Sequence, residues 1–227
     1  MKGPQPHGLR AAVFAEFLAT ALLLIAVVGS GIAAERLCQG NIGLALLANA
    51  LATAAALFVL ILVFAPISGA HMNPVVTLAA ATVNDFAWRA VPIYIAAQVA
   101  GAVIGTWIAH AMFGAPIIEL GTQVRTGTGQ WIAEAVAVFG LLGTIWGCMS
   151  YTTPTAAAAV AAYIGGAYWF TASTSFANPA VTIARSLTDS FSGIRPADSV
   201  GFIAAQIVGL LIALPLLRGL TASRRSA

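Results

Sequence analysis

Long apolar stretches separated by short polar breaks fill most of the chain. Six of them are close to the roughly 20 residues that a helix needs to cross a membrane. The fifth stretch is the shortest and is rich in alanine. The stretches do not alternate apolar with polar positions, which argues against a transmembrane β-barrel. The pattern therefore predicts six transmembrane helices, over residues 11–33, 42–64, 89–112, 131–150, 154–172 and 197–219.

Two further apolar segments are too short to cross a membrane. One runs from Asn73 to Asn84, and the other from Asn178 to about Leu187. Each begins with Asn-Pro, and Asn is a favoured helix N-cap while Pro suits the first helical position. Irregular backbone at membrane depth is tolerated only where protein or a watery cavity surrounds it. We therefore expect two re-entrant half-helices that line a cavity.

The two halves of the chain repeat one order of polar residues around the Asn-Pro motifs. Glu16 in the first span corresponds to Glu134 in the fourth, and Gln98 in the third corresponds to Gln206 in the sixth. Because each half contains three spans, the second half is inverted relative to the first. We expect one membrane domain over residues 1–227, with halves at about 11–112 and 131–219 and a polar linker at 113–130.

Two pairs of glycines spaced four residues apart predict close contacts between helices. The pairs are Gly101 with Gly105 and Gly143 with Gly147. Small residues at this spacing let helix backbones approach one another inside a membrane.

Composition supports a membrane protein with several spans. Hydrophobic residues make up 60% of the chain and charged residues 7%, whereas soluble domains carry about 25% charged residues. Basic residues gather at the two chain ends, so the positive-inside rule places both termini in the cytoplasm. We expect a multi-pass protein of the cell inner membrane without a cleavable signal peptide, and the net charge of +3 does not indicate nucleic-acid binding. The clustered basic residues are Lys2, Arg10, Arg218, Arg224 and Arg225.

Cysteine, histidine and serine do not form a reactive or metal-binding pattern. Cys38 and Cys148 are expected at opposite membrane faces, which disfavours a disulfide between them. His7, His71 and His110 are too scattered along the chain to suggest a metal site. The spans contain no Ser/His/Asp set and no paired catalytic carboxylates, so we expect no enzyme, no cofactor and no metal.

This arrangement resembles the aquaporin family, also called major intrinsic proteins, from about residue 11 to 219. The most specific part is Ser-Gly-Ala-His-x-Asn-Pro at 68–74, reinforced by Asn-Pro-Ala at 178–180. The resemblance implies an all-α membrane protein with six transmembrane helices and two re-entrant half-helices in an inverted repeat. It also implies a homotetramer in membrane lipid that passes water and small neutral solutes. The implied pore motifs are Asn73, Pro74, Val75, Asn178, Pro179 and Ala180.

The two asparagines have a physical role beside that resemblance. A helix N-terminus carries about half a positive charge and exposes unpaired N–H groups. Two such ends that face each other at mid-membrane repel cations, including hydronium. The side-chain oxygens of Asn73 and Asn178 are expected to cap their helices while the amide N–H groups face the pore; the alternative is a structural cap only. Val75 replaces the usual Ala and either shifts the packing of Pro74 slightly or has no effect.

Glu16 and Glu134 are the only acids well inside the predicted spans. A carboxylate buried in a membrane is costly, and it is a candidate for function. The pair either carries protons or ions, or accepts hydrogen bonds from the backbone of the re-entrant loops. Because the acids recur symmetrically without a Lys or Arg partner, the second role is favoured. His71 is expected to support the first loop, with gating as the alternative.

Four positions near the outer mouth set pore width and polarity in the family. Arg usually occupies the last and a large aromatic residue the first, but here all four are small or medium-sized and uncharged. Arg185 lies seven residues past Asn178, about two helical turns along, so we do not expect it to replace the missing Arg. Counting from the Asn-Pro motifs places the four positions at Thr53, Gly166, Ser175 and Val181.

Such a wide filter predicts a passive channel for water and small uncharged solutes. Candidate solutes are glycerol, urea and metalloid hydroxides such as arsenous acid, and the chain is similar to the aquaporin type that bacterial arsenic-resistance operons encode. The alternatives are a water-selective aquaporin and an ion-coupled secondary transporter. The spans offer only two Glu residues for ion coupling, which favours the channel.

Overall fold

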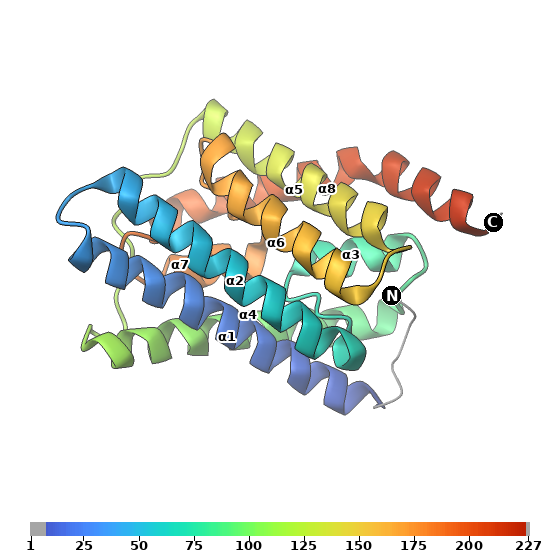
Figure 1. Ribbon diagram of the computed structural model, residues 1–227, viewed down its shortest axis with the longest axis horizontal. Helices are drawn as coiled ribbons and strands as arrows, with labels where there is room; N and C mark the ends of the chain where they lie inside the picture. The colour runs from blue at the N-terminus through green and yellow to red at the C-terminus, as the bar shows by residue number, and fades with distance from the viewer. Residues whose placement is uncertain (1–7, 226–227) are drawn as a thin grey trace.

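The computed structural model describes residues 8–225, with side chains to residue 222, so His7 and Lys2 lie outside it. Long helices run lengthwise through a single bundle, and α1 begins at the end of the bundle where α8 ends (Figure 1). We call this end the chain-end side and the opposite end, where residues 114–127 lie, the linker side. The elements are α1 Gly8–Leu37, α2 Ile42–Ser68, α3 Pro74–Thr82, η1 Trp88–Ala90, α4 Val91–Phe113, α5 Thr128–Cys148, α6 Thr153–Phe170, α7 Pro179–Arg185 and α8 Pro196–Arg225.

Every predicted span and both predicted half-helices correspond to a helix, so the all-α prediction is confirmed. The linker is shorter than predicted, because α5 begins at Thr128 and residues 128–130 are helical. Among the described residues, five helices are long and apolar enough to cross a membrane, namely α1, α2, α4 with η1, α5 and α8. The alanine-rich α6 has 18 residues and is not among the five. It packs against α2 and α5 and completes the bundle.

Glycine brings the helix backbones together beside the two intramembrane acids. A Cβ on Gly101 of α4 would overlap the carbonyl oxygen of Phe17, which follows Glu16 in α1. In the second half, a Cβ on Gly209 of α8 would collide with the carbonyl oxygen of Ala135, which follows Glu134 in α5. The pairs α1–α4 and α5–α8 therefore meet at matching points.

The predicted glycine contacts are right for one pair and wrong for the other. Gly105, like Gly101, packs against the backbone of α1, at Ala21. Gly143 has room for a Cβ at 3.5 Å from Leu216, and a Cβ on Gly147 would meet no atom within 4 Å. Spacing alone does not show which face of α5 meets a neighbouring helix, and that face decides whether a small residue is needed.

The half-helices α3 and α7 begin at the predicted Asn-Pro motifs. The side-chain oxygen of Asn73 accepts a hydrogen bond from the Val75 N–H at 2.9 Å. That of Asn178 accepts from the N–H groups of Ala180 and Val181 at 3.0 and 3.3 Å. The predicted N-caps are thus confirmed, and α3 and α7 contact each other inside the bundle.

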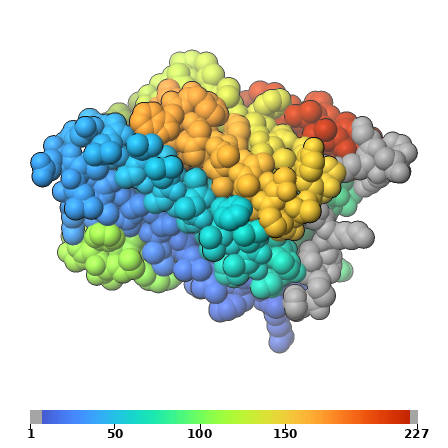
Figure 2. All heavy atoms as spheres, in the orientation of Figure 1, coloured from blue at the N-terminus to red at the C-terminus, as the bar shows by residue number. Residues whose placement is uncertain are grey.

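The outer surface of the bundle is apolar, as a membrane protein requires. α2 and α6 lie side by side on the face shown in Figure 2. Large apolar side chains are exposed along both helices, and contact with lipid or another protein would cover them. They include Leu44, Leu51 and Val59 of α2 and Trp169 and Phe170 of α6.

Candidate pore between the half-helices

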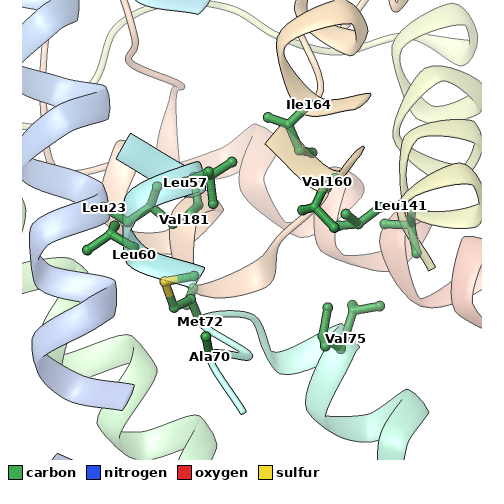
Figure 3. Packing of buried hydrophobic residues seen from close by; sticks show 14 of the residues in the cluster. Leu23, Leu57, Leu60, Ala70, Met72, Val75, Leu141, Val160, Ile164 and Val181 are labelled. Carbon is green, nitrogen blue, oxygen red and sulfur yellow. The ribbon is translucent and has the colours of Figure 1, made fainter. Parts of the chain in front are cut away.

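A cavity of about 430 Å³ lies between the half-helices and the surrounding long helices. Asn73 and Asn178 both line it. Among the described residues of its wall, Arg185 is the one side chain with a formal charge. Figure 3 shows the apolar walls, with α2 and α7 on one side and α5 and α6 on the other. Their labelled cavity-lining residues are Leu57 and Val181 on the first side and Leu141, Val160 and Ile164 on the second.

The two asparagine side chains tie the re-entrant loops together. The amide nitrogen of Asn73 donates to the carbonyl of Ala177 at 2.8 Å, and that of Asn178 donates to the carbonyl of Met72 at 2.7 Å. Each acceptor directly precedes the opposite asparagine in the sequence. An amide nitrogen carries two hydrogens, so one remains on each side chain after this bond is made.

Glu16 accepts four hydrogen bonds around the first re-entrant loop. Its Oε1 accepts from the Ser68 hydroxyl at 2.7 Å and from the His71 N–H at 2.9 Å. Its Oε2 accepts from the Met72 N–H at 2.7 Å and from the Gln98 amide at 2.8 Å. The carboxylate is fully buried, and these donors replace the water that it would otherwise require.

Glu134 makes the corresponding contacts around the second loop. It accepts from the N–H groups of Phe176 and Ala177 at 2.9 and 2.8 Å and from the Gln206 amide at 2.6 Å. Phe176 and Ala177 are two and one positions before Asn178. His71 and Met72, whose N–H groups bind Glu16, are likewise two and one positions before Asn73. The structure therefore places both acids against the loops.

A threonine and a glutamine complete this network in each half, and sequence reasoning missed their roles. Gln98 donates to the Thr77 hydroxyl at 3.0 Å, and that hydroxyl donates to the Asn73 carbonyl at 3.1 Å. In the second half the distances are 2.9 Å from Gln206 to Thr182 and 2.8 Å from Thr182 to the carbonyl of Asn178. The recurrence of a threonine four residues after each asparagine is the sequence signal that indicates these roles.

The backbone of both re-entrant loops is left-handed at matched positions. Non-glycine residues adopt positive φ rarely, and each such residue costs of order 1–3 kcal/mol unless its surroundings impose it. The carboxylates bind N–H groups within these segments, so they stabilise this conformation. The residues and φ angles are Gly69 (90°), Ala70 (49°) and Met72 (49°) in the first loop, and Thr174 (61°), Ser175 (52°) and Ala177 (49°) in the second.

His71 belongs to the first re-entrant loop, and its side chain lines the cavity. Its Nδ1 is 3.0 Å from the Thr77 hydroxyl. The ring packs on Phe86 and Tyr94, with centroid distances of 5.2 and 5.6 Å. These contacts fit a loop support, while the position in the wall leaves the gating alternative open.

Three of the four predicted filter positions line the cavity, and the fourth does not. Thr53, Ser175 and Val181 are buried in its wall. Gly166 is exposed and faces away, so its assignment is corrected. α6 instead presents Ile164 and Tyr168, each two residues from it. Two residues rotate the direction of a side chain by about 200° on an α-helix, so an offset of two in the count reverses the face.

Arg185, which we did not expect to replace the missing filter arginine, lines the cavity. This residue is four positions after Val181, so both lie on one face of α7, and both line the cavity. The Arg185 guanidinium carbon lies 3.4 Å from the centre of the Phe176 ring. Its Nε donates to the carbonyl of Ser192. The distance from Asn178 along the chain was therefore a poor guide to the direction of this side chain.

Cysteines and metal-binding residues do not assemble around the cavity. Both Cys38 and Cys148 are free, and Cys148 alone of the two lines the wall. Within residues 8–225, His, Cys, Asp and Glu form no group of three or more that is placed to hold a metal ion.

Comparison with known proteins places this arrangement in a family. The sequence profile of the family described as "Major intrinsic protein" matches residues 5–171. The chain therefore belongs to the major intrinsic protein family.

Individual relatives agree with that assignment. The chain is 50% identical over 206 residues to a protein named "Aquaglyceroporin AqpS" from Rhizobium meliloti (strain 1021), covering 91% of this chain and 88% of that one. It is 36% identical over 146 residues to "Aquaporin TIP1-1" of Zea mays, covering 62% and 57%. The X-ray structure of the aquaglyceroporin from Plasmodium falciparum superposes with a TM-score of 0.74 at 19% identity, covering 94% and 96% of the two chains, and shares the fold.

The family, the fold and the lined cavity together define the class of protein. The chain is a membrane channel for water and small solutes, and it is not an enzyme.

Proposed function

We propose that this channel passively conducts water together with small uncharged hydroxyl solutes such as glycerol, urea and arsenous acid. The cavity carries the proposal, because it includes both asparagines and has a mouth that combines hydroxyl groups with apolar side chains. The relative named an aquaglyceroporin, 50% identical over most of both chains, supports the same solute class.

The mouth offers both hydrogen-bonding and apolar side chains. Thr53 and Tyr168 present hydroxyl groups 3.2 Å apart, and the buried Ser175 hydroxyl makes no hydrogen bond within the described structure. Val181 of α7 and Ile164 of α6 supply apolar contacts from opposite walls. A polyol or a neutral hydroxide presents hydroxyl groups that these oxygens can bind, which offsets the loss of water on entry.

Tyr168 makes the proposed filter narrower than four small residues imply. The corrected set is Thr53, Tyr168, Ser175 and Val181, without Gly166 and without an arginine directly after Asn-Pro-Ala. A tyrosine replaces a glycine in this set, but Val181 keeps the α7 side of the mouth short and apolar.

The waist of the pore lies at Asn73 and Asn178. One amide hydrogen of each is bonded to the opposite loop, and we assign the other to a passing water or hydroxyl oxygen. The positive ends of α3 and α7 meet at the same point and disfavour cations. Pro74, Val75, Pro179 and Ala180 form the first turns behind the asparagines, and Glu16, Glu134 and His71 act as loop buttresses.

The transporter alternative conflicts with the way that the loops are joined. Alternating access moves one repeat against the other around the binding site. Here the bonds from Asn73 to Ala177 and from Asn178 to Met72 cross between the halves at the centre of the cavity, and rocking would break them. A water-selective aquaporin is the remaining alternative, and comparing water permeability with solute permeability distinguishes it from the proposed channel.

We place both termini in the cytoplasm, in the cell inner membrane, with repeat halves at about 11–112 and 131–219. The start of α1 and the end of α8 at one end of the bundle agree with this orientation (Figure 1). A homotetramer would cover part of the exposed apolar surface of the outer helices.

A permeability panel tests the proposed function. We expect purified protein in proteoliposomes to speed osmotic water flow and the uptake of glycerol, urea and arsenous acid without any ion gradient. Stopped-flow light scattering and tracer uptake measure these rates. Water flow without solute uptake would instead support the water-selective alternative, and uptake that a protonophore abolishes would support the transporter.

A thiol reagent provides a second test, because Cys148 lines the cavity and Cys38 does not. We expect a bulky methanethiosulfonate reagent to reduce glycerol flux at least fivefold in the natural protein and in Cys38→Ser. The Cys148→Ser variant should keep its flux after the same treatment. Block that persists in Cys148→Ser would show that solute takes a path other than this cavity.

A further inference from the structure

Arg185 is fixed in place on three sides at the linker-side end of the cavity. It ends α7, its side chain is 2% exposed, and its guanidinium lies on the ring of Phe176. Nε donates to the carbonyl of Ser192. Of the guanidinium nitrogens, only Nε has a hydrogen-bond partner among the described residues, so Nη1 and Nη2 remain for the cavity that the side chain lines.

The ring beneath the guanidinium is itself held rigidly. Phe176 is buried, and its N–H donates to Glu134 at 2.9 Å. The ring meets Phe202 of α8 edge-on, with 5.0 Å between centroids. The same carboxylate that shapes the second loop therefore positions the surface on which Arg185 stacks, and cation–π attraction adds to that contact.

A second arginine approaches the same ring and provides a comparison within the chain. The guanidinium carbon of Arg125, in the linker, lies 5.4 Å from the Phe176 centroid. Its nitrogens donate to the carbonyls of Gly193 at 2.8 Å and Phe191 at 3.4 Å and to the Gln123 side chain at 3.1 Å. Arg125 does not belong to the described cavity wall, so it joins the linker to the segment before α8.

We propose that Arg185 is the residue that excludes cations at the pore mouth, in place of an arginine at position 181. Val181 leaves the usual position uncharged, and Arg185 supplies a fixed positive charge one helical turn farther from the asparagines. The cavity wall contains no acid among the described residues, and the Glu134 carboxylate that bonds the Phe176 N–H lies outside that wall. A cation entering from the linker side meets the Arg185 charge before it reaches the waist, while a neutral hydroxyl solute does not.

The proposal separates two properties that one arginine usually combines. A long cationic side chain at position 181 would narrow the mouth and repel cations together. At position 185 the side chain lies along Phe176 and adds a positive charge. The short Val181 side chain meanwhile keeps the mouth wide. The inferred substrate class is therefore neutral solutes wider than water, with K⁺ and Na⁺ rejected. This inference rests on the proposed function.

The test compares Arg185→Gln with Arg125→Gln in proteoliposomes. We expect Arg185→Gln to raise K⁺ leak at least tenfold over the natural protein while glycerol flux changes less than threefold, because a fixed charge in a low-dielectric site acts strongly on ions. Arg125→Gln should leave K⁺ leak unchanged. Both variants are checked for folding by size-exclusion profile and thermal stability in detergent.

Chemical restoration of the charge gives an independent measurement. In a Cys148→Ser background, Arg185→Cys should leak K⁺, a cationic methanethiosulfonate reagent should suppress the leak, and the neutral methyl reagent should not. This comparison is made within one folded preparation, so it does not depend on the stability of the Gln variant.

The outcomes separate this inference from the function on which it rests. Unchanged K⁺ leak in both Arg185 variants, with glycerol flux retained, would overturn the inference and leave the neutral-solute channel intact. Equal leak in Arg125→Gln would overturn it as well, because loosening of the linker would then explain the result. A natural protein without glycerol flux would refute the proposed function and this inference together.

Discussion

Val181→Arg combined with Thr53→Phe is expected to reduce glycerol and arsenous acid flux more than tenfold, with a much smaller loss of water flux. Val181 and Thr53 lie in the wall of the cavity. Both substitutions add bulk to the mouth, and the arginine adds a second guanidinium one turn from Arg185. Solutes wider than water lose the most from a narrower passage. Stopped-flow measurements of both fluxes on the same vesicle preparation provide the ratio.

Two single variants identify the cause of that loss. Val181→Leu adds one methylene without charge, and we expect it to lower glycerol flux less than twofold. Thr53→Phe alone adds bulk on the α2 side and removes the hydroxyl near Tyr168. Its flux, compared with that of the double variant, shows how much of the loss comes from the arginine on the α7 side. Equal proportional loss of water and glycerol in the double variant would show that these positions do not form the constriction.

Glu16→Gln is expected to lower the thermal stability of the protein by roughly 6–12 °C, equivalent to about 3 kcal/mol for a chain of this size. The carboxylate accepts four hydrogen bonds, and an amide NH₂ in place of one oxygen faces donors instead of accepting from them. Each buried donor left without an acceptor costs about 1–3 kcal/mol. The N–H groups of His71 and the left-handed Met72 then have one acceptor oxygen between them instead of two.

Glu35→Gln is the matched control for this effect. Glu35 is an exposed acid that accepts one hydrogen bond, from the Phe191 N–H at 3.1 Å, and its neutralisation should change the melting temperature by less than 2 °C. Fluorescence-detected unfolding in detergent measures both variants. A Glu16→Gln protein with normal stability and altered proton dependence of transport would contradict the buttress role and favour proton carriage.

Features that depend on local sequence were predictable, and features that depend on helix rotation were not. The Asn-Pro starts of α3 and α7 follow from capping chemistry within a few residues, and the spans follow from their length and apolarity. Gly166 was misplaced because counting along the chain does not fix the direction in which a helical residue faces. The spacing of four residues places Arg185 on the same face of α7 as Val181, whereas no local signal encodes its stacking on Phe176.

The internal repeat predicts more of the site than the spacing of the motifs alone. Recurrence of Glu and Gln around the two Asn-Pro motifs placed Glu16 and Glu134 near the loops before any contact was known. It did not show that Gln98 and Gln206 bridge each acid to a threonine, because that bridge needs the close approach of two helices. Gly101 and Gly209 permit this approach, and only the packed structure shows which backbone they meet.

The reciprocal bonds of the asparagines have a consequence for biogenesis. The acceptor of the Asn73 amide, Ala177, lies 104 residues farther along the chain. During synthesis, α1 and α4 can pair as soon as the first half is inserted, but the loop before α3 must wait for the second half to supply its acceptor. A nascent chain halted between the halves can therefore have α1 and α4 paired, but it lacks the acceptor for the Asn73 amide. We therefore expect both loops to close together, once the second half is in the bilayer.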